Sequence, residues 1–267
     1  MLRLLAGNGG AVKRTFAFLA ILMLVFAASA GAELSQKGDL FVHFGGGISP
    51  KALPRDSRAS IAVRIEGTIR GLSGEHPPPL RRIKIELNRG GVLDAKGLPT
   101  CRQSQIEFAT GPEALATCGS ALVGAGGIVA RTDLGGQANT RIRGEVLLFN
   151  SVANGQPSIL AHIFQKKPAQ IIRVVVFRVQ RRGGQFGTVI TGKLSPSLNT
   201  NGYLESIFLQ LQRQYSFRGR SKAYLSASCA APPGFSAAIF PFAKVSMSFA
   251  DGRTLSSTMT RSCKVRG

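Results

Sequence analysis

Two short basic clusters contain the residues of this chain that are best suited to bind a ligand. The first is Arg181-Arg182, and the second comprises Arg218, Arg220 and Lys222. The arginine guanidinium is a planar fork that pairs with a carboxylate or phosphate through two hydrogen bonds at once. Because both clusters fall at the ends of expected strands, we expect them to meet at one rim and contact an anionic cell-envelope polymer or an acidic glycan. The alternative is that these side chains are only solvent-exposed charges in turns.

The charge of the chain fits a ligand of the same kind. Lysine and arginine number 34 against 13 aspartates and glutamates, so the formal net charge is +21 at pH 7. A charge of this size bears on partners and solubility and says little about the fold. The alternative explanation for the charge is a general enrichment in arginine. In that case the charges would only keep the outer faces of the strands soluble.

Four cysteines are available for disulfides or for a metal site. An even number in an oxidising compartment indicates two disulfides, for which three pairings exist. We expect Cys101–Cys118 and Cys229–Cys263, because each pair closes a loop of modest length around a local unit. A zinc site is not expected, since there is no C-x-x-C spacing and the three histidines are scattered. We therefore expect neither a metal nor another cofactor.

Two glycine-containing stretches come close to catalytic motifs. The run from His43 to Gly47 is similar to the oxyanion strand of lipases, but that chemistry also needs a G-x-S-x-G nucleophile turn, and the nearest match, Gly71–Glu75, fails at its last position. The segment Gly187–Leu194 nearly matches a phosphate-binding loop, but Leu194 replaces the hydroxyl residue that would bind Mg²⁺. Neither stretch predicts an enzyme, and we expect no nucleotide ligand.

A hydrolase acting on envelope glycans or esters is the alternative function. Such an enzyme needs two carboxylates that flank the scissile bond, usually with aromatic surfaces for sugar rings. The 13 acidic residues leave room for such a pair, but the chain has no tryptophan and only three tyrosines. We therefore name no catalytic residue and place a binding function first.

Strands are the elements expected to position the basic clusters. Short runs of alternating apolar and polar residues recur along the chain, as in Ile61–Glu66 and Ile83–Leu87, which we expect to lie near each other. We predict an all-β fold, an antiparallel β-sandwich of many short strands. The further strands are expected at Ala121–Arg131, Ile142–Phe149, Ser158–Phe164, Ile171–Gln180, Phe186–Lys193, Tyr203–Arg213, Phe242–Phe249 and Thr254–Cys263.

One short helix is predicted near residues 112–118. Thr110 is a good N-cap residue, Pro112 suits the first turn, and Glu113 completes a capping box. The helix would carry Cys118 back toward Cys101, which supports the pairing of these two cysteines.

Three further local features can be predicted. Asp251-Gly252, between two alternating runs, indicates a C-terminal hairpin, because glycine tolerates the positive φ of tight turns. The nearly continuous apolar run Ile171–Phe177 indicates a central strand covered on both faces. His162 lies in an apolar run, and we expect it to be a buried, hydrogen-bonded structural residue rather than a ligand.

The first 32 residues have the composition of a secretory signal peptide. A positive start is followed by the uncharged apolar run Phe16–Ala28 and by small residues, with cleavage expected after Ala30 or Ala32. The run is shorter than the roughly 20 residues that a membrane-spanning helix needs. The remaining residues, 33–267, are expected to form one exported domain, secreted or at the cell surface, with a split near 133–140 as the alternative. Export makes nucleic acid a less expected partner than envelope polymers.

Several strings taken together resemble a group of exported, β-rich proteins of actinobacterial type without an assigned activity. The resemblance implies a signal peptide and a β fold, and it supplies no catalytic residues. The strings are Leu53-Pro54-Arg55, Gly97-Leu98-Pro99 followed by Cys101, Ser120–Gly124, Ile159–His162, Tyr224–Cys229, Phe240–Ala243 and Ser262-Cys263.

Overall fold

The fold was analysed in a computed structural model, which describes residues 33–72, 76–134, 137–194 and 202–266. The expected signal peptide, residues 1–32, lies outside the described residues. The chain is mostly strand, at 65%, with 6% helix, which confirms the all-β prediction.

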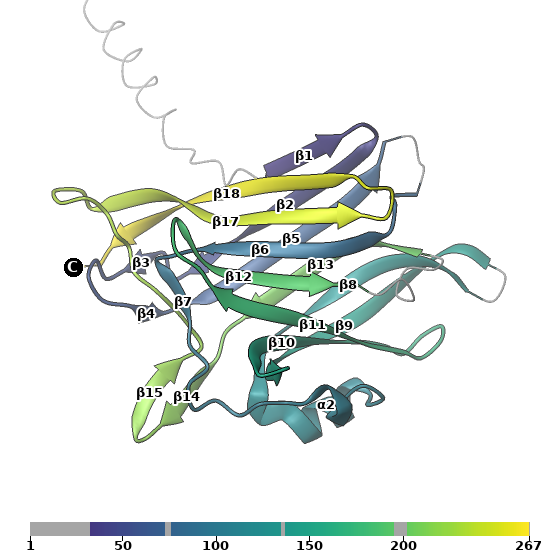
Figure 1. The fold of residues 1–267 in the computed structure, drawn as a ribbon, viewed down its shortest axis with the longest axis horizontal. Coiled ribbons are helices and arrows are strands. Elements are labelled where there is room, and N and C mark those ends of the chain that lie inside the picture. Colours follow the sequence, from purple (N-terminus) through teal and green to yellow (C-terminus); the bar gives the residue numbers. More distant parts are fainter. Residues whose placement is uncertain (1–32, 73–75, 135–136, 195–201, 267) are drawn as a thin grey trace, which may run out of the picture. The chain divides into compact units, whose positions relative to one another are not determined.

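Thirteen strands form one large sheet (Figure 1). Neighbouring strands are antiparallel except for the last pair, β18 and β3, which is parallel. In sheet order the strands are β1 (Glu33–Lys37), β2 (Leu40–Ser49), β5 (Ala62–Gly71), β13 (Gly202–Leu211), β8 (Leu122–Leu134), β9 (Gln137–Ala153), β10 (Gln156–Gln165), β11 (Ile171–Arg181), β12 (Phe186–Lys193), β6 (Leu80–Asn88), β17 (Ala237–Phe249), β18 (Thr254–Val265) and β3 (Ala52–Leu53).

Several smaller elements lie outside the large sheet. A three-stranded sheet contains β4 (Ala59–Ser60), β16 (Leu225–Ala227) and β7 (Gly91–Leu93), and a separate hairpin contains β14 (Gln214–Phe217) and β15 (Arg220–Ala223). The helices are α2 (Gly111–Cys118), η2 (Gln103–Gln105) and η3 (Gly119–Ala121). In the described part of the chain, no helix is long and apolar enough to cross a membrane.

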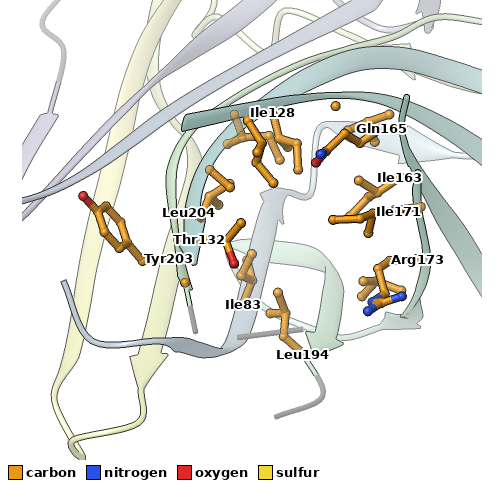
Figure 2. Close-up of a pocket in the computed structure, with 18 of the residues that line it drawn as sticks. Ile83, Ile128, Thr132, Ile163, Gln165, Ile171, Arg173, Leu194, Tyr203 and Leu204 are labelled. Carbon is orange, nitrogen blue, oxygen red and sulfur yellow. The ribbon is translucent and has the colours of Figure 1, made fainter. Parts of the chain in front are cut away.

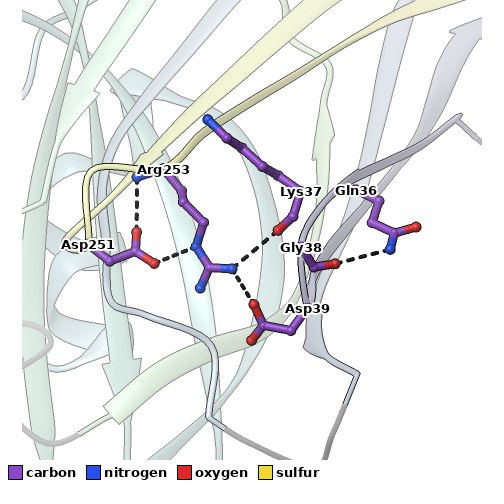
Figure 3. A network of polar contacts seen from close by, with 6 residues as sticks. All are labelled: Gln36, Lys37, Gly38, Asp39, Asp251 and Arg253. Carbon is purple, nitrogen blue, oxygen red and sulfur yellow. Dashed lines mark hydrogen bonds and ion pairs between the residues drawn. The ribbon is translucent and has the colours of Figure 1, made fainter.

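The large sheet curls until its first strand reaches its C-terminal hairpin, and side chains close this seam (Figure 1). The Glu33 carboxylate accepts a hydrogen bond from the backbone N–H of Thr260 at 2.9 Å. Arg253, in the turn between β17 and β18, donates to the carboxylates of Asp39 and Asp251 (Figure 3). Because the strands belong to one continuous curled sheet, the predicted sandwich of two separate sheets is not confirmed.

The strand positions follow from the alternating sequence pattern, but the strand partners do not. Each expected strand coincides with an observed one. The runs Ile61–Glu66 and Ile83–Leu87 place their apolar residues in the same core, yet their strands do not pair: β5 pairs with β2 and β13, and β6 pairs with β12 and β17. The two runs therefore share a core without being paired strands, because alternation determines which face is buried and not which strand lies alongside.

A second, smaller core lies beneath α2 on the other face of β9 and β10. The helix begins as predicted, with the backbone N–H of Thr110 donating to the Glu113 carboxylate at 2.7 Å. Buried Phe149 and Leu160 pack there with the Cys101–Cys118 disulfide, which confirms the first predicted pairing. The helix therefore covers the part of the sheet whose opposite face is described below.

His162 is fully buried in this region, as predicted. Its Nε2–H donates to the Ala109 carbonyl at 2.8 Å, just before α2 begins. A carbonyl only accepts, so Nε2 carries the proton and the ring joins β10 to the segment leading into the helix. This confirms a structural histidine.

The C-terminal hairpin is formed by β17 and β18, with Asp251-Gly252 in its turn, and Gly252 has φ +82°. Cys229 is linked to Cys263 of β18, which confirms the second predicted pairing. Two disulfides indicate an extracellular or otherwise oxidising environment.

Candidate ligand-binding cavity

An apolar cavity of about 340 Å³ lies on the inner face of the curled sheet. Five neighbouring strands, β13, β8, β9, β10 and β11, supply most of its wall, and Ile83 of β6 and Leu194, just after β12, complete it. Figure 2 shows the lining side chains arranged around an open space, with Ile128 and Leu204 on one side and Ile163 and Ile171 on another. The curl of the sheet thus encloses a space that a flat sheet would leave open.

Period-two alternation explains why these strands present an apolar face to the cavity. On β11, Ile171, Val175 and Phe177 line it, and on β9 Val146 and Leu148 line it. Successive side chains of a strand point to opposite faces, so residues two apart share one wall. The intervening residues of β9 and β10 pack under α2 instead, and the helix side therefore supports the wall from behind.

The cavity is closed at one end and more accessible at the other. Val146, Leu148, Ala161 and Val175 are each at most 5% exposed and form the closed end. The side chains of Ile142, Ile171, Thr132 and Tyr203 are only half-buried. A ligand would reach the apolar interior from this second end.

Arg173 is the charged group on β11 that borders the cavity (Figure 2). It lies directly opposite Ile163 of β10 in the strand register. Its side chain is exposed, and its Nη1 donates to the neighbouring Ile172 carbonyl at 2.9 Å. Among the described residues, no aspartate or glutamate forms an ion pair with it.

A second basic group lies beside the accessible end. Arg131 of β8 lines the cavity and contacts the Glu205 carboxylate at 3.1 Å, while Arg141 contacts the other oxygen of the same carboxylate at 2.8 Å. The hydrogen bond from Arg141 is the main cause of a lowered Glu205 pKa, with Arg131 acting in the same direction against desolvation. Two guanidinium groups share one carboxylate, so this network carries a net positive charge.

None of the five basic residues singled out in the sequence lines this cavity, and two of them, Arg181 and Lys222, lie near Asp94. The Lys222 ammonium is 3.0 Å from the Asp94 carboxylate. The Arg181 guanidinium donates a hydrogen bond to the carbonyl of Leu93, the residue before Asp94. Burial opposes ionisation of Asp94, but the Lys96 backbone N–H and then Lys222 outweigh it and lower the Asp94 pKa.

The β14–β15 hairpin carries Arg218, Arg220 and Lys222, whereas Arg182 directly follows β11. Arg218 and Lys222 both lie over the Phe217 ring, at 5.3 and 5.6 Å from its centroid. Arg182 and Arg220 are exposed, and neither forms an ion pair within the part of the chain that the structure describes. The structure thus brings Arg181 and Lys222 together, with Arg218 beside Lys222.

The sequence analysis missed the cavity and Arg173. The sequence did contain a signal for Arg173, which is the single charged residue in the otherwise apolar segment Ile171–Phe177. Such a residue indicates a polar group on an apolar face. The expectation that this strand is covered on both faces is only partly correct. Val175 is buried and the strand is central in the sheet, whereas Val174 and Val176 are half-buried near α2.

No aspartate or glutamate is among the described residues that line the cavity, and the nearest one discussed, Glu205, is paired with Arg131 and Arg141. Within ranges 33–72, 76–134, 137–194 and 202–266, no three histidine, cysteine, aspartate or glutamate residues gather in a way that could hold a metal ion.

Comparison of the chain with protein-family models, with curated proteins and with solved structures finds no match.

Proposed function

We propose that this protein is an exported, non-enzymatic binding protein whose curled sheet holds a small apolar ligand. The observation that carries this proposal is the cavity of about 340 Å³ on the inner face of the sheet, with an aliphatic wall. Small-molecule sites typically have volumes of roughly 300–1,000 Å³, apolar walls and a few polar groups at defined positions. The cavity has all three properties.

Each CH₂ group moved from water into an apolar site contributes about 0.8 kcal/mol, or about fourfold in Kd. Val146, Leu148, Ala161 and Val175 supply a closed apolar end into which such groups can be placed. A flexible chain bound there would gain affinity with each added carbon until the cavity is filled.

A ligand series tests this function. Saturated alcohols from C8 to C16 are titrated into the oxidised protein by calorimetry, and the thermal midpoint is followed in parallel, since a ligand that binds only the folded state raises it. We expect Kd to fall about fourfold per added carbon and then to level off once the cavity is full. No binding by any alcohol would overturn the proposal.

Two matched variants locate the binding within the sheet. Ala130→Phe fills the cavity from its half-buried wall, whereas Val129→Phe places the same ring on the preceding residue of β8, which is not part of the lining. We expect A130F to weaken alcohol binding at least tenfold and V129F to bind normally. A variant at the closed end, Leu148→Ala, should shift the levelling-off to a longer chain. Equal effects of A130F and V129F would place binding elsewhere.

Secretion and a cell-surface location form part of the proposal. They are supported by the two disulfides and by the signal-peptide composition of residues 1–32. Determination of the N-terminal residue of the protein recovered from the medium or envelope tests both, with Gly31 or Glu33 expected from cleavage after Ala30 or Ala32.

Binding of an anionic envelope polymer or acidic glycan through the basic turns is a second proposal. It is supported by Arg182, Arg218 and Arg220, which are exposed and without ion pairs in the described structure. Co-sedimentation with isolated envelope at low and high salt tests it. Salt should release the protein, because exposed charges are screened over about 8–10 Å near physiological ionic strength. Replacement of Arg181, Arg182, Arg218 and Arg220 by alanine should also release it, and unchanged binding would remove this site.

A further inference from the structure

We propose that the ligand of the cavity is an aliphatic chain with an anionic head group, such as a long-chain carboxylate, and that Arg173 binds the head group. This inference rests on the proposed apolar-ligand function and specifies the class of ligand. It requires a chain-shaped apolar space, a cationic group at its border and an electrostatic preference for anions.

The lining favours a chain over a flat ring system. The walls contributed by β9 and β10 are aliphatic or small, with Val146, Leu148, Ala161 and Ile163 among them. The aromatic lining residues are Phe177 and Tyr203, and they come from strands that are not neighbours. Two rings in a mostly aliphatic lining give a flat ligand little surface for stacking.

Arg173 is placed where the head group of such a chain would lie. It shares the inner face of β11 with Ile171 and Val175, the residues two positions before and after it, and it faces Ile163 across the β10 register. Aliphatic contacts and a guanidinium are thus adjacent on one wall, with the guanidinium at the exposed side and Val175 at the buried side.

The guanidinium also has donors left for a ligand. It has five N–H donors, and one of them is used by the Ile172 carbonyl. Asp and Glu residues of the described chain do not pair with it. A carboxylate or phosphate matches this fork with two hydrogen bonds. An ammonium head group would be repelled.

The surroundings strengthen this preference. The Arg131–Glu205–Arg141 network beside the accessible end combines two positive charges with one negative charge. The formal charge of the whole chain is +21. Positive potential over the cavity entrance therefore attracts anionic amphiphiles and disfavours cationic ones.

The experiment compares three probes with the same C14 alkyl chain: tetradecanoate, 1-tetradecanol and tetradecyltrimethylammonium. The two ionic probes are kept below their critical micelle concentrations and the alcohol below its solubility limit. Wild type, Arg173→Gln and Arg178→Gln are titrated at low and at physiological salt. Arg178 lies on the same strand, is exposed and is not part of the lining, so R178Q removes the same charge from the other face. Arg173→Lys is included as a variant that retains the positive charge.

We expect wild type to bind tetradecanoate more tightly than the alcohol, and the ammonium probe least. R173Q should weaken tetradecanoate binding about fivefold, the effect of an exposed ion pair, without changing the affinity for the alcohol. R173K should retain part of the difference, and R178Q should match wild type. Thermal unfolding confirms that each variant is folded.

Equal binding of acid and alcohol by wild type, or an R173Q variant with unchanged affinity for tetradecanoate, would overturn the anionic-head proposal and leave the apolar-ligand function intact. Failure of all three probes to bind wild type would overturn the proposed function itself.

Discussion

Arg253 donates a hydrogen bond to the carboxylate of Asp39, and this contact joins the last turn of the chain to the turn that follows its first strand (Figure 3). The same Nη1 also donates to the Lys37 carbonyl at 3.2 Å, and Nε donates to Asp251. The Arg253 hydrogen bond is the first cause of a lowered Asp39 pKa. The seam of the curled sheet is therefore held here by one side chain with three partners.

Arg253→Gln should loosen this seam. Loss of the charge removes both ion pairs and the fork that reaches the Lys37 carbonyl, so we expect faster amide hydrogen exchange in β1 and in the β17–β18 turn. Exchange in β9 and β10 should not change. Arg70→Gln, which removes an exposed charge from β5, is the control. Unaltered exchange in β1 would mean that Glu33 and strand pairing hold the seam without Arg253.

Removal of the Cys229–Cys263 disulfide by the double Cys→Ser variant should lower the free energy of unfolding by about 4 kcal/mol, from the loop-entropy relation applied to a separation of 34 residues. The Cys101–Cys118 pair, separated by 17 residues, should contribute about 3 kcal/mol. Denaturant unfolding of the two double variants measures both values. The reverse ranking would show that native-state contacts outweigh loop length.

Gly97→Ala should disturb the β14–β15 hairpin. Gly97 has φ +85°, and a Cβ atom there would lie 2.0 Å from Cδ2 of Phe217. The positive φ costs about 1–3 kcal/mol for a residue other than glycine, and the ring must also move. Gly219→Ala is a matched control, because Gly219 has φ +72° with no atom within 4 Å of its Cβ position. G97A should be the less stable variant and should be cut faster by trypsin at Arg218. Similar cleavage of the two would show that Phe217 moves away without loosening the hairpin.

Glu205 should make stability depend on pH in the acid range. Its folded-state pKa lies below the ordinary value of 4.5, so its contribution is complete above pH 4.5 and is lost as the pH falls through the lowered folded-state value. Glu205→Gln should therefore lower Tm at pH 7 by about 2–4 °C, for a contribution of about 1 kcal/mol. The difference from wild type should shrink on acidification.

Glu107→Gln, which removes the same charge near η2, provides the comparison for Glu205→Gln. A Tm difference between E205Q and wild type that grows as the pH falls would contradict the assigned direction of the Glu205 pKa.

Some elements could be predicted because their causes are local. Thr110 and Glu113 form the capping box that begins α2, and Asp251-Gly252 forms the turn of the last hairpin. Cys118 reaches Cys101 because the helix between them reverses the chain. In each case the deciding interactions lie within a few residues or across a short loop.

Other features depend on which strand lies beside which, and alternation does not contain that information. Ile61–Glu66 and Ile83–Leu87 look alike as sequences, but six strands separate β5 from β6 in the sheet. The same uncertainty extends to Arg173, which is an isolated charge in the sequence and becomes a cavity residue only when β11 pairs with β10.

Residue type and spacing were enough to predict the strand positions, the short helix, the C-terminal hairpin, the disulfide pairs and the structural role of His162, because local hydrogen bonding, loop closure and burial depend mainly on them. The strand order, the curl that brings Arg253 to Asp39 and the cavity beside Arg173 became visible only in the folded chain. These depend on contacts between residues far apart in the chain, where many pairings bury the same apolar faces and only the complete packing selects one.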